Sequence, residues 1–295
     1  MHCAYVRSAA REHTVWYEWF SSRPILTTAA GENGPARRRE ICGFEVVLAV
    51  LTSPQNPVIK EVRRAIAQGG LTRDGFCVTE GPRLVEEAVR SGCEVDVVFA
   101  SQPSFPAPPG VRIVEVSGSV LRSISSTETP QGVVALVRPP SWSLVDVMAG
   151  EALVMVLDGI QEPGNAGAIL RAAEAFSATG AVFLKGSVNP YNPKCIRASA
   201  GSIFRLPLVH GVEDAAALNQ LALYAARPDA GVPPDQADLR SPCAIIIGSE
   251  GRGVRTELAA KASGLRVPTA GVESLNVAVA AGILLYEARR QRTRP

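Results

Sequence analysis

The chain has 295 residues, of which 46% are hydrophobic and 20% are charged, and its formal net charge at pH 7 is +2. This length and apolar content predict a buried core and two domains, while the near-neutral charge excludes nucleic-acid binding through a strong overall positive field. No apolar run approaches the ~20 residues that a membrane-spanning helix needs, so we expect no membrane partner.

The N-terminal residues 1–45 show neither helical nor strand periodicity over a useful length. We interpret them as a disordered extension, or as the product of a start codon assigned too far upstream, because short charge runs are usually solvated. The alternative is an additional nucleic-acid-binding arm that uses Arg37, Arg38 and Arg39 within the Gly/Pro/Arg-rich residues 31–39.

Residues 46–137 alternate between helical and strand patterns. Apolar spacing predicts helices at 58–68 and 81–90, and strands at 75–80, 95–100, 112–116 and 132–137. These elements predict a small α/β domain. Two adjacent prolines in residues 138–150 predict a linker to a second domain.

The second domain, residues 151–295, begins with the apolar run LVMVLD at 153–158, which is typical of a strand covered on both faces. Similar runs at 181–184, 204–209 and 244–247 alternate with alanine-rich helical stretches and predict a mainly parallel sheet. Asn192 and Pro193 favour a helix start. The last predicted helix, 277–290, has an apolar stripe made of Val277, Ala278, Ala281, Leu284 and Leu285.

Three short segments of this domain place glycine or asparagine beside charge, each after a β-branched run and before a helical stretch. They are GIQEPGNAGAILR at 159–171, IGSEGRG at 247–253 and VPTAGVESLNVAV at 267–279. Such strand-to-helix turns are where α/β proteins build ligand sites. We expect Asn165 to cap a helix at 166–176, Arg171 to lean back over the mouth of the site, and Ser274 to cap the last helix.

The three segments, in this order, resemble the motifs of the SpoU (TrmH-like) RNA ribose 2′-O-methyltransferases of the SPOUT superfamily, over about residues 50–291. The resemblance implies an α/β fold with a C-terminal trefoil-knotted SPOUT methyltransferase domain and a mainly parallel sheet, preceded by a small α/β RNA-recruiting domain. It implies S-adenosylmethionine as the cofactor, held by the main chain around Gly248, Val267 and Leu275. It also implies a homodimer that pairs through the last helix.

The resemblance assigns catalytic positions to Asn165, Arg171, Glu250, Ser274 and Asn276. We expect Glu250 to orient Asn165 or Arg171 through a charge-assisted hydrogen bond, and Asn276 to point into the site. Two roles stay open for Arg171. The family pattern implies action on the nucleophilic hydroxyl, as base, whereas the poor proton affinity of a guanidinium favours a clamp on the target phosphate and the developing alkoxide.

The expected substrate is 23S rRNA, and the alternatives are tRNA methylation or a catalytically silent RNA-binding protein of the same fold. In the small domain the candidate contacts to RNA phosphate are Arg63, Arg64, Arg73, Arg83 and Arg122. A dinucleotide-binding enzyme is disfavoured, because the glycine spacing at 248–253 does not fit G-x-G-x-x-G and only 42 residues follow it.

The six cysteines lie at positions 3, 42, 77, 93, 195 and 243, and no two of them form a C-x-x-C pair. This scatter favours neither a zinc site nor a disulfide framework. We therefore expect a cytoplasmic, metal-independent enzyme.

Overall fold

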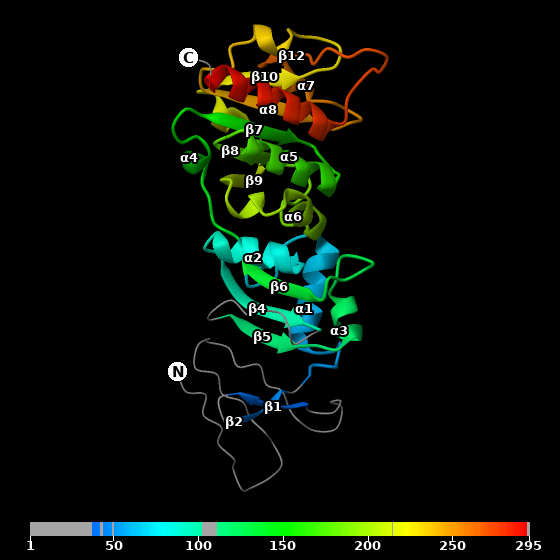
Figure 1. Ribbon diagram of the computed structural model, residues 1–295. Helices are drawn as coiled ribbons and strands as arrows, with labels where there is room; N and C mark the ends of the chain where they lie inside the picture. The colour runs from blue at the N-terminus through cyan, green and yellow to red at the C-terminus, as the bar shows by residue number, and fades with distance from the viewer. Residues whose placement is uncertain (1–36, 42–43, 49, 102–110, 214, 294–295) are drawn as a thin grey trace.

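The computed structural model describes residues 37–41, 44–48, 50–101, 111–213 and 215–293. Figure 1 shows two α/β domains stacked on each other. Strands β1 (Arg37–Ile41) and β2 (Phe44–Leu48) form an antiparallel hairpin ahead of them. The sequence pattern did not predict this hairpin. The remainder of the interpretation of residues 1–45 lies outside the described residues.

The small domain is built on a four-stranded sheet in the order β3-β6-β4-β5. Its strands are β3 (Cys77–Glu80), β4 (Glu94–Ala100), β5 (Arg112–Glu115) and β6 (Val133–Arg138). Alternate residues along a strand point to opposite faces. Val97 and Phe99 pack with helices α1 (Pro57–Gln68) and α3 (Gly118–Ser123), whereas Val98 and Ala100 pack with α2 (Pro82–Arg90). The sheet is therefore covered on both sides, and the predicted helices and strands of this domain are confirmed.

The large domain is built on a six-stranded sheet in the order β12-β10-β11-β7-β8-β9, in which every neighbouring pair is parallel. Its strands are β7 (Leu153–Asp158), β8 (Gly180–Leu184), β9 (Leu208–Val212), β10 (Ala222–Ala226), β11 (Cys243–Gly248) and β12 (Ser263–Leu265). All six residues of β7 are buried. The prediction of a parallel sheet with a doubly covered first strand is confirmed.

Helices cover both faces of this sheet. Side chains of α5 (Pro163–Ala175), α6 (Pro193–Ser199) and α8 (Val277–Thr293) pack on one face, with the short helix η1 (Ser202–Phe204). The other face carries α4 (Leu144–Val147), η2 (Ala215–Leu218) and α7 (Thr256–Ala259). The short helix η3 (Pro234–Gln236) contacts α8. The trefoil knot stays a prediction from the family resemblance.

Four details of the sequence reading are corrected. The strand expected at 204–209 begins only at Leu208, because Phe204 closes η1. Strands β10 and β12 were missed, since both are short and partly exposed and so lack a continuous apolar run. The remaining two corrections concern the starts of helices α5 and α8, which carry site residues.

Helix α5 begins earlier than expected. Pro163 occupies its first helical position and the Glu162 side chain caps it by accepting from the Gly164 amide, so Asn165 is the third helical residue and does not cap. Helix α8 is capped by Asn276, not by Ser274, because Asn276 Oδ1 accepts from the amides of Ala278 at 2.9 Å and Val279 at 3.3 Å.

The segment expected to be a linker, 138–150, is packed against the large domain. It holds α4, which contacts β8 and β9 and buries Val147 completely. One continuous hydrophobic cluster runs from α2 of the small domain to the α5 face of the large domain. Polar contacts join them too: Arg205 pairs with Glu87 of α2 at 2.7 Å and with Glu174 of α5 at 2.5 Å. The two domains therefore share a core.

Candidate active site

The three sequence segments meet at one end of the large sheet, through a chain of side-chain hydrogen bonds. Asn165 Nδ2 donates to Glu250 Oε1 at 2.5 Å, and Asn276 Nδ2 donates to Asn165 Oδ1 at 3.1 Å. These residues are 85 and 111 positions apart in the sequence. Of the two partners expected for Glu250, Asn165 and Arg171, the structure shows a bond to Asn165, and the catalytic roles of these residues stay predictions.

Asn276 has a double role in this chain of bonds. Its carbonyl oxygen caps α8, while its amide nitrogen reaches Asn165 on α5. Capping fixes the side chain, because the same residue satisfies amides that the first helical turn leaves without partners. Asn165 is half-buried and Glu250 and Asn276 are exposed, so a substrate can reach the polar atoms.

The loop that carries Glu250, residues 249–255, is fixed at both ends. Gly253 donates its amide to Ser249 O at 2.8 Å, which closes a tight turn. A Cβ atom at Gly248 would lie 2.0 Å from the carbonyl carbon of Gly253. Glycine is therefore required at 248 by the close approach of its own loop, which is a different reason from the approach to adenosine that the resemblance implied.

A buried ion pair fixes the far end of this loop. The Asp158 carboxylate is 4% exposed and lies 2.5 Å from Arg255 Nη2; it also accepts from Arg255 Nε at 2.7 Å and from the Arg255 amide at 2.8 Å. The same guanidinium donates to the carbonyls of Lys185 and Glu213. Arg255 thus ties the loop to the ends of β7, β8 and β9. Sequence reasoning missed this pair, and its signal was a carboxylate that ends the wholly apolar run of β7.

The neighbouring loop, residues 267–275, is different. Within the described part of the chain, its only hydrogen bond joins Thr269 Oγ1 to Val272 O, and its backbone amides and other backbone carbonyls make none. Val267 and Leu275 are half-buried at its two ends. Unpaired backbone groups beside apolar side chains fit an adenine ring, whose edge has both donors and acceptors and whose faces are apolar.

Comparison with known proteins agrees with this geometry. Residues 152–286 match the model of the SpoU rRNA Methylase family, and residues 56–135 match the MRM3-like substrate binding domain. An uncharacterized tRNA/rRNA methyltransferase of Synechocystis is 36% identical, over 83% of this chain and 95% of that protein. The 23S rRNA (guanosine(2553)-2′-O)-methyltransferase RlmP of Bacillus subtilis is 30% identical, over 81% and 98%. The chain belongs to the SpoU family.

A solved structure supports the same conclusion for the fold. The AdoMet-bound rRNA methyltransferase of Sinorhizobium meliloti is 29% identical and superposes with a TM-score of 0.72, over 81% of this chain and 97% of that one. The match spans both domains of the SpoU protein described here. The family resemblance read from the three segments is thereby confirmed.

Two expected catalytic residues stand apart from the hydrogen-bonded chain. Arg171 and Ser274 are exposed, and neither side chain has a hydrogen bond or ion pair to a described residue. At about 100° per residue, six residues turn a helix by 600°, so Arg171 lies about 120° around α5 from Asn165. Its guanidinium is free to meet a ligand, but within the described residues it does not contact Asn165 or Glu250.

The five arginines expected to contact RNA divide into two groups. Glu61 accepts from the Arg64 guanidinium at 2.6 Å and from the Arg73 amide at 2.6 Å, and its carboxylate also lies 3.8 Å from Arg73 Nε. Arg63, Arg83 and Arg122 are exposed, and their side chains have no hydrogen bond or ion pair to the described residues. Of the five arginines predicted to contact RNA, three therefore have unpaired side chains and two already pair with Glu61.

The described residues contain neither a cluster of metal-binding side chains nor a helix able to span a membrane. No group of three or more His, Cys, Asp or Glu side chains in them is arranged to hold a metal ion. None of their helices combines the length and apolar character that crossing a membrane requires. Metal independence stays a prediction.

Proposed function

We propose that the protein is an S-adenosylmethionine-dependent ribose 2′-O-methyltransferase that acts on 23S rRNA in the cytoplasm. The observation that supports this most is the chain Glu250–Asn165–Asn276, which joins the three family segments beside a loop with free backbone groups. A relative that matches along 98% of its own length is named a 23S rRNA 2′-O-methyltransferase, which favours rRNA over tRNA.

S-adenosylmethionine supplies a methyl carbon that the ribose 2′-oxygen attacks as the carbon–sulfur bond breaks. In our proposal the backbone around Val267 and Leu275 holds the adenine edge, and Gly248 shapes the loop beside it. The reaction then depends on placing the hydroxyl in line with the methyl group at ~3 Å.

Asn165 is suited to position the ribose hydroxyl. An amide nitrogen carries two N–H groups, and only one of those on Asn165 is used, toward Glu250. The bond to the carboxylate is stronger than a neutral hydrogen bond, so it fixes the direction in which the second N–H of Asn165 points.

We assign Arg171 to the substrate phosphate and the developing alkoxide, and Ser274 to a contact with substrate or cofactor at the start of α8. A free planar guanidinium binds phosphate in a bidentate manner. The hydroxyl proton then leaves to the substrate phosphate or to water, since a guanidinium is a poor acceptor.

We also propose that the protein is a homodimer that pairs through α8. The inner face of α8 is core, with Ala281, Leu284 and Leu285 fully buried. Its outer face exposes Val279 (51%), Ile283 (39%) and Tyr286 (55%), which recur at helical spacing and form a single apolar stripe. Such a stripe is typical of a protein interface.

The dimer is tested by charge on this stripe. Wild-type protein should sediment at about twice its chain mass of 31.1 kDa at micromolar concentration. Tyr286→Glu should give a folded monomer with strongly reduced methyl transfer, whereas Arg289→Glu, an exposed change on the same helix, should stay dimeric. A wild-type monomer with full activity would contradict the dimer.

The function is tested by mapping 2′-O-methyl groups in total RNA from a deletion strain and its parent. One 23S rRNA site should be lost on deletion and restored in vitro by the purified protein with S-adenosylmethionine. Loss of a tRNA site instead would make tRNA the substrate. Absence of S-adenosylmethionine binding by isothermal titration would indicate a silent RNA-binding protein.

A further inference from the structure

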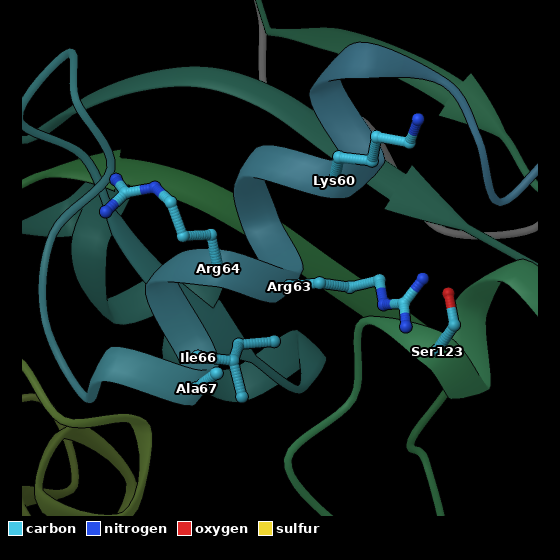
Figure 2. Close-up of a pocket in the computed structure, with 6 residues that line it drawn as sticks. All are labelled: Lys60, Arg63, Arg64, Ile66, Ala67 and Ser123. Atoms are coloured by element: carbon cyan, nitrogen blue, oxygen red, sulfur yellow. The ribbon is translucent and has the colours of Figure 1, made fainter.

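A hollow of about 420 Å³ lies on the small domain between α1 and α3, remote from the three family segments. Figure 2 shows its lining: Lys60, Arg63, Arg64, Ile66 and Ala67 from α1, and Ser123 from α3. Its volume falls within the range of small-molecule sites, about 300–1,000 Å³.

Two of the three cations in the hollow are free. Lys60 and Arg63 are exposed and, among the described residues, their side chains have no hydrogen-bond or ion-pair partner. In Figure 2 the Arg63 side chain extends toward Ser123 and that of Arg64 toward the other side of α1. Arg64 is held there by Glu61, whose pKa falls to about 2 mainly because of that hydrogen bond. The hollow therefore presents two unpaired positive charges.

The rest of the lining limits what can occupy the hollow. Ile66 and Ala67 contribute apolar surface, and the Ser123 hydroxyl already donates to Val120 O at 2.7 Å. No carboxylate lines the hollow. An occupant with one anionic group and one flat, apolar part matches these walls, and a nucleotide has both: the phosphate meets the cations and the base lies on the aliphatic side chains.

The position of α1 links this hollow to the active site. The helix ends at Gln68 and is capped by Gly69, where a Cβ atom would lie 2.6 Å from the side chain of Asn192, the residue that caps α6 of the large domain. Helix α6 in turn packs on α5, so closely that a Cβ at Gly167 would lie 2.3 Å from Cys195 O. Because these helices are in contact and the domains share a core, an RNA bound in the hollow is held at a fixed distance from Asn165.

We propose that Lys60 and Arg63 bind a backbone phosphate of one nucleotide of the substrate RNA in this hollow, away from the methylated ribose. The inference rests on the proposed function for the identity of the RNA. It selects Arg63 from the five arginines and adds Lys60, whose side chains are both unpaired, in preference to Arg64 and Arg73, which pair with Glu61.

The test measures the affinity of the full-length protein for unmodified 23S rRNA transcript across a range of salt concentrations. Each lost phosphate contact should reduce the slope of log K against log salt by about 0.7–0.9. Lys60→Glu with Arg63→Glu removes this one phosphate contact, so it should reduce the slope by about 0.7–0.9 and weaken binding roughly 10-fold or more at ~0.1 M salt. Affinity for S-adenosylmethionine and the rate at saturating RNA should stay within about two-fold.

The controls are chosen within the same domain. Arg90→Glu reverses the charge of an arginine on α2, which covers the opposite face of the sheet. This variant should leave the slope of log K against log salt unchanged. Arg63→Ala removes one positive charge without adding a negative one. The slope can therefore still be measured on this variant if the charge reversals disturb folding. Arg64→Ala should also leave the slope unchanged.

Two results would overturn the inference: an unchanged slope for the double variant, or an equal loss for Arg90→Glu. Neither touches the proposed function, which rests on methyl transfer. Conversely, a reduced slope in a protein that transfers no methyl group to any RNA would retain the phosphate site and reject the enzyme.

Discussion

The two loops at the active-site edge are fixed in opposite ways. Loop 249–255 is closed by the Gly253 amide and tied by Arg255 to a buried carboxylate and two backbone carbonyls. Loop 267–275 makes one internal bond, from Thr269 Oγ1 to Val272 O, and among the described residues its other backbone groups have no hydrogen-bond partner. The first loop must place a side chain, Glu250, whereas the second must keep main-chain groups available for a ligand. The candidate site therefore combines one loop that is fixed by hydrogen bonds with one loop whose main-chain groups are mostly unpaired.

The largest effect is expected from filling the tight turn of the fixed loop. Gly248→Val would place its Cβ about 2.0 Å from backbone atoms of Gly253 and Val254, which have no rotamer to escape to. We expect a loss of stability above the usual overpacking cost of about 1–3 kcal/mol, with no detectable methyl transfer. Thermal unfolding and a methylation assay measure both. Gly251→Ala is the control, because no atom lies within 4 Å of its Cβ position. Equal behaviour of the two variants would contradict the steric explanation.

The next effect comes from untying the same loop. Arg255→Ala leaves the Asp158 carboxylate buried without a cation, which costs about 3 kcal/mol, the lower end of the range for buried pairs, since Arg255 itself is 34% exposed. Urea unfolding measures this loss. Asp158→Asn with Arg255→Ala should recover part of it, because the uncompensated charge is gone. If Arg255→Ala unfolds like wild type, the pair does not fix the loop.

A third variant leaves both loops intact and removes the free guanidinium. Arg171→Ala should reduce the single-turnover rate by roughly 10², about 2.7 kcal/mol, and leave S-adenosylmethionine affinity within a few-fold, as expected for a transition-state contact. Arg171→Lys should restore little, because an ammonium lacks the planar fork. A wild-type rate for Arg171→Ala at saturating RNA would mean that Arg171 is a surface residue and that our assignment is wrong.

The smallest effect separates the two roles of Asn276 at the end of the open loop. Asn276→Ala removes the cap of α8 and should cost about 1 kcal/mol of stability. Asn276→Asp keeps a capping oxygen but cannot donate to Asn165 Oδ1, so stability should stay near wild type while the methylation rate falls. If Asn276→Asp is fully active, the bond to Asn165 is dispensable.

Much of the fold follows from local patterns in the sequence. Apolar runs predicted the continuously apolar strands of both sheets, such as β7 and β11. Capping residues followed by proline predicted the starts of helices such as α6. They failed where the local signal is weak, at the half-exposed strands β10 and β12, and where two caps compete. At α5 the sequence offers both Glu162 and Asn165, and Pro163 decides for the former because its ring favours the first helical position.

By itself the sequence identified the candidate site residues, which are glycines, asparagines and a glutamate in three segments, each at a turn after an apolar run. Only the tertiary structure decided which of them touch. Asn165 meets Glu250 and Asn276 because strands β7 and β11 are neighbours in the sheet and α8 packs on α5, while Arg171 turns away by the pitch of its helix. Contacts across 85 and 111 residues depend on the order of strands, and that order leaves no trace in the spacing of neighbouring residues.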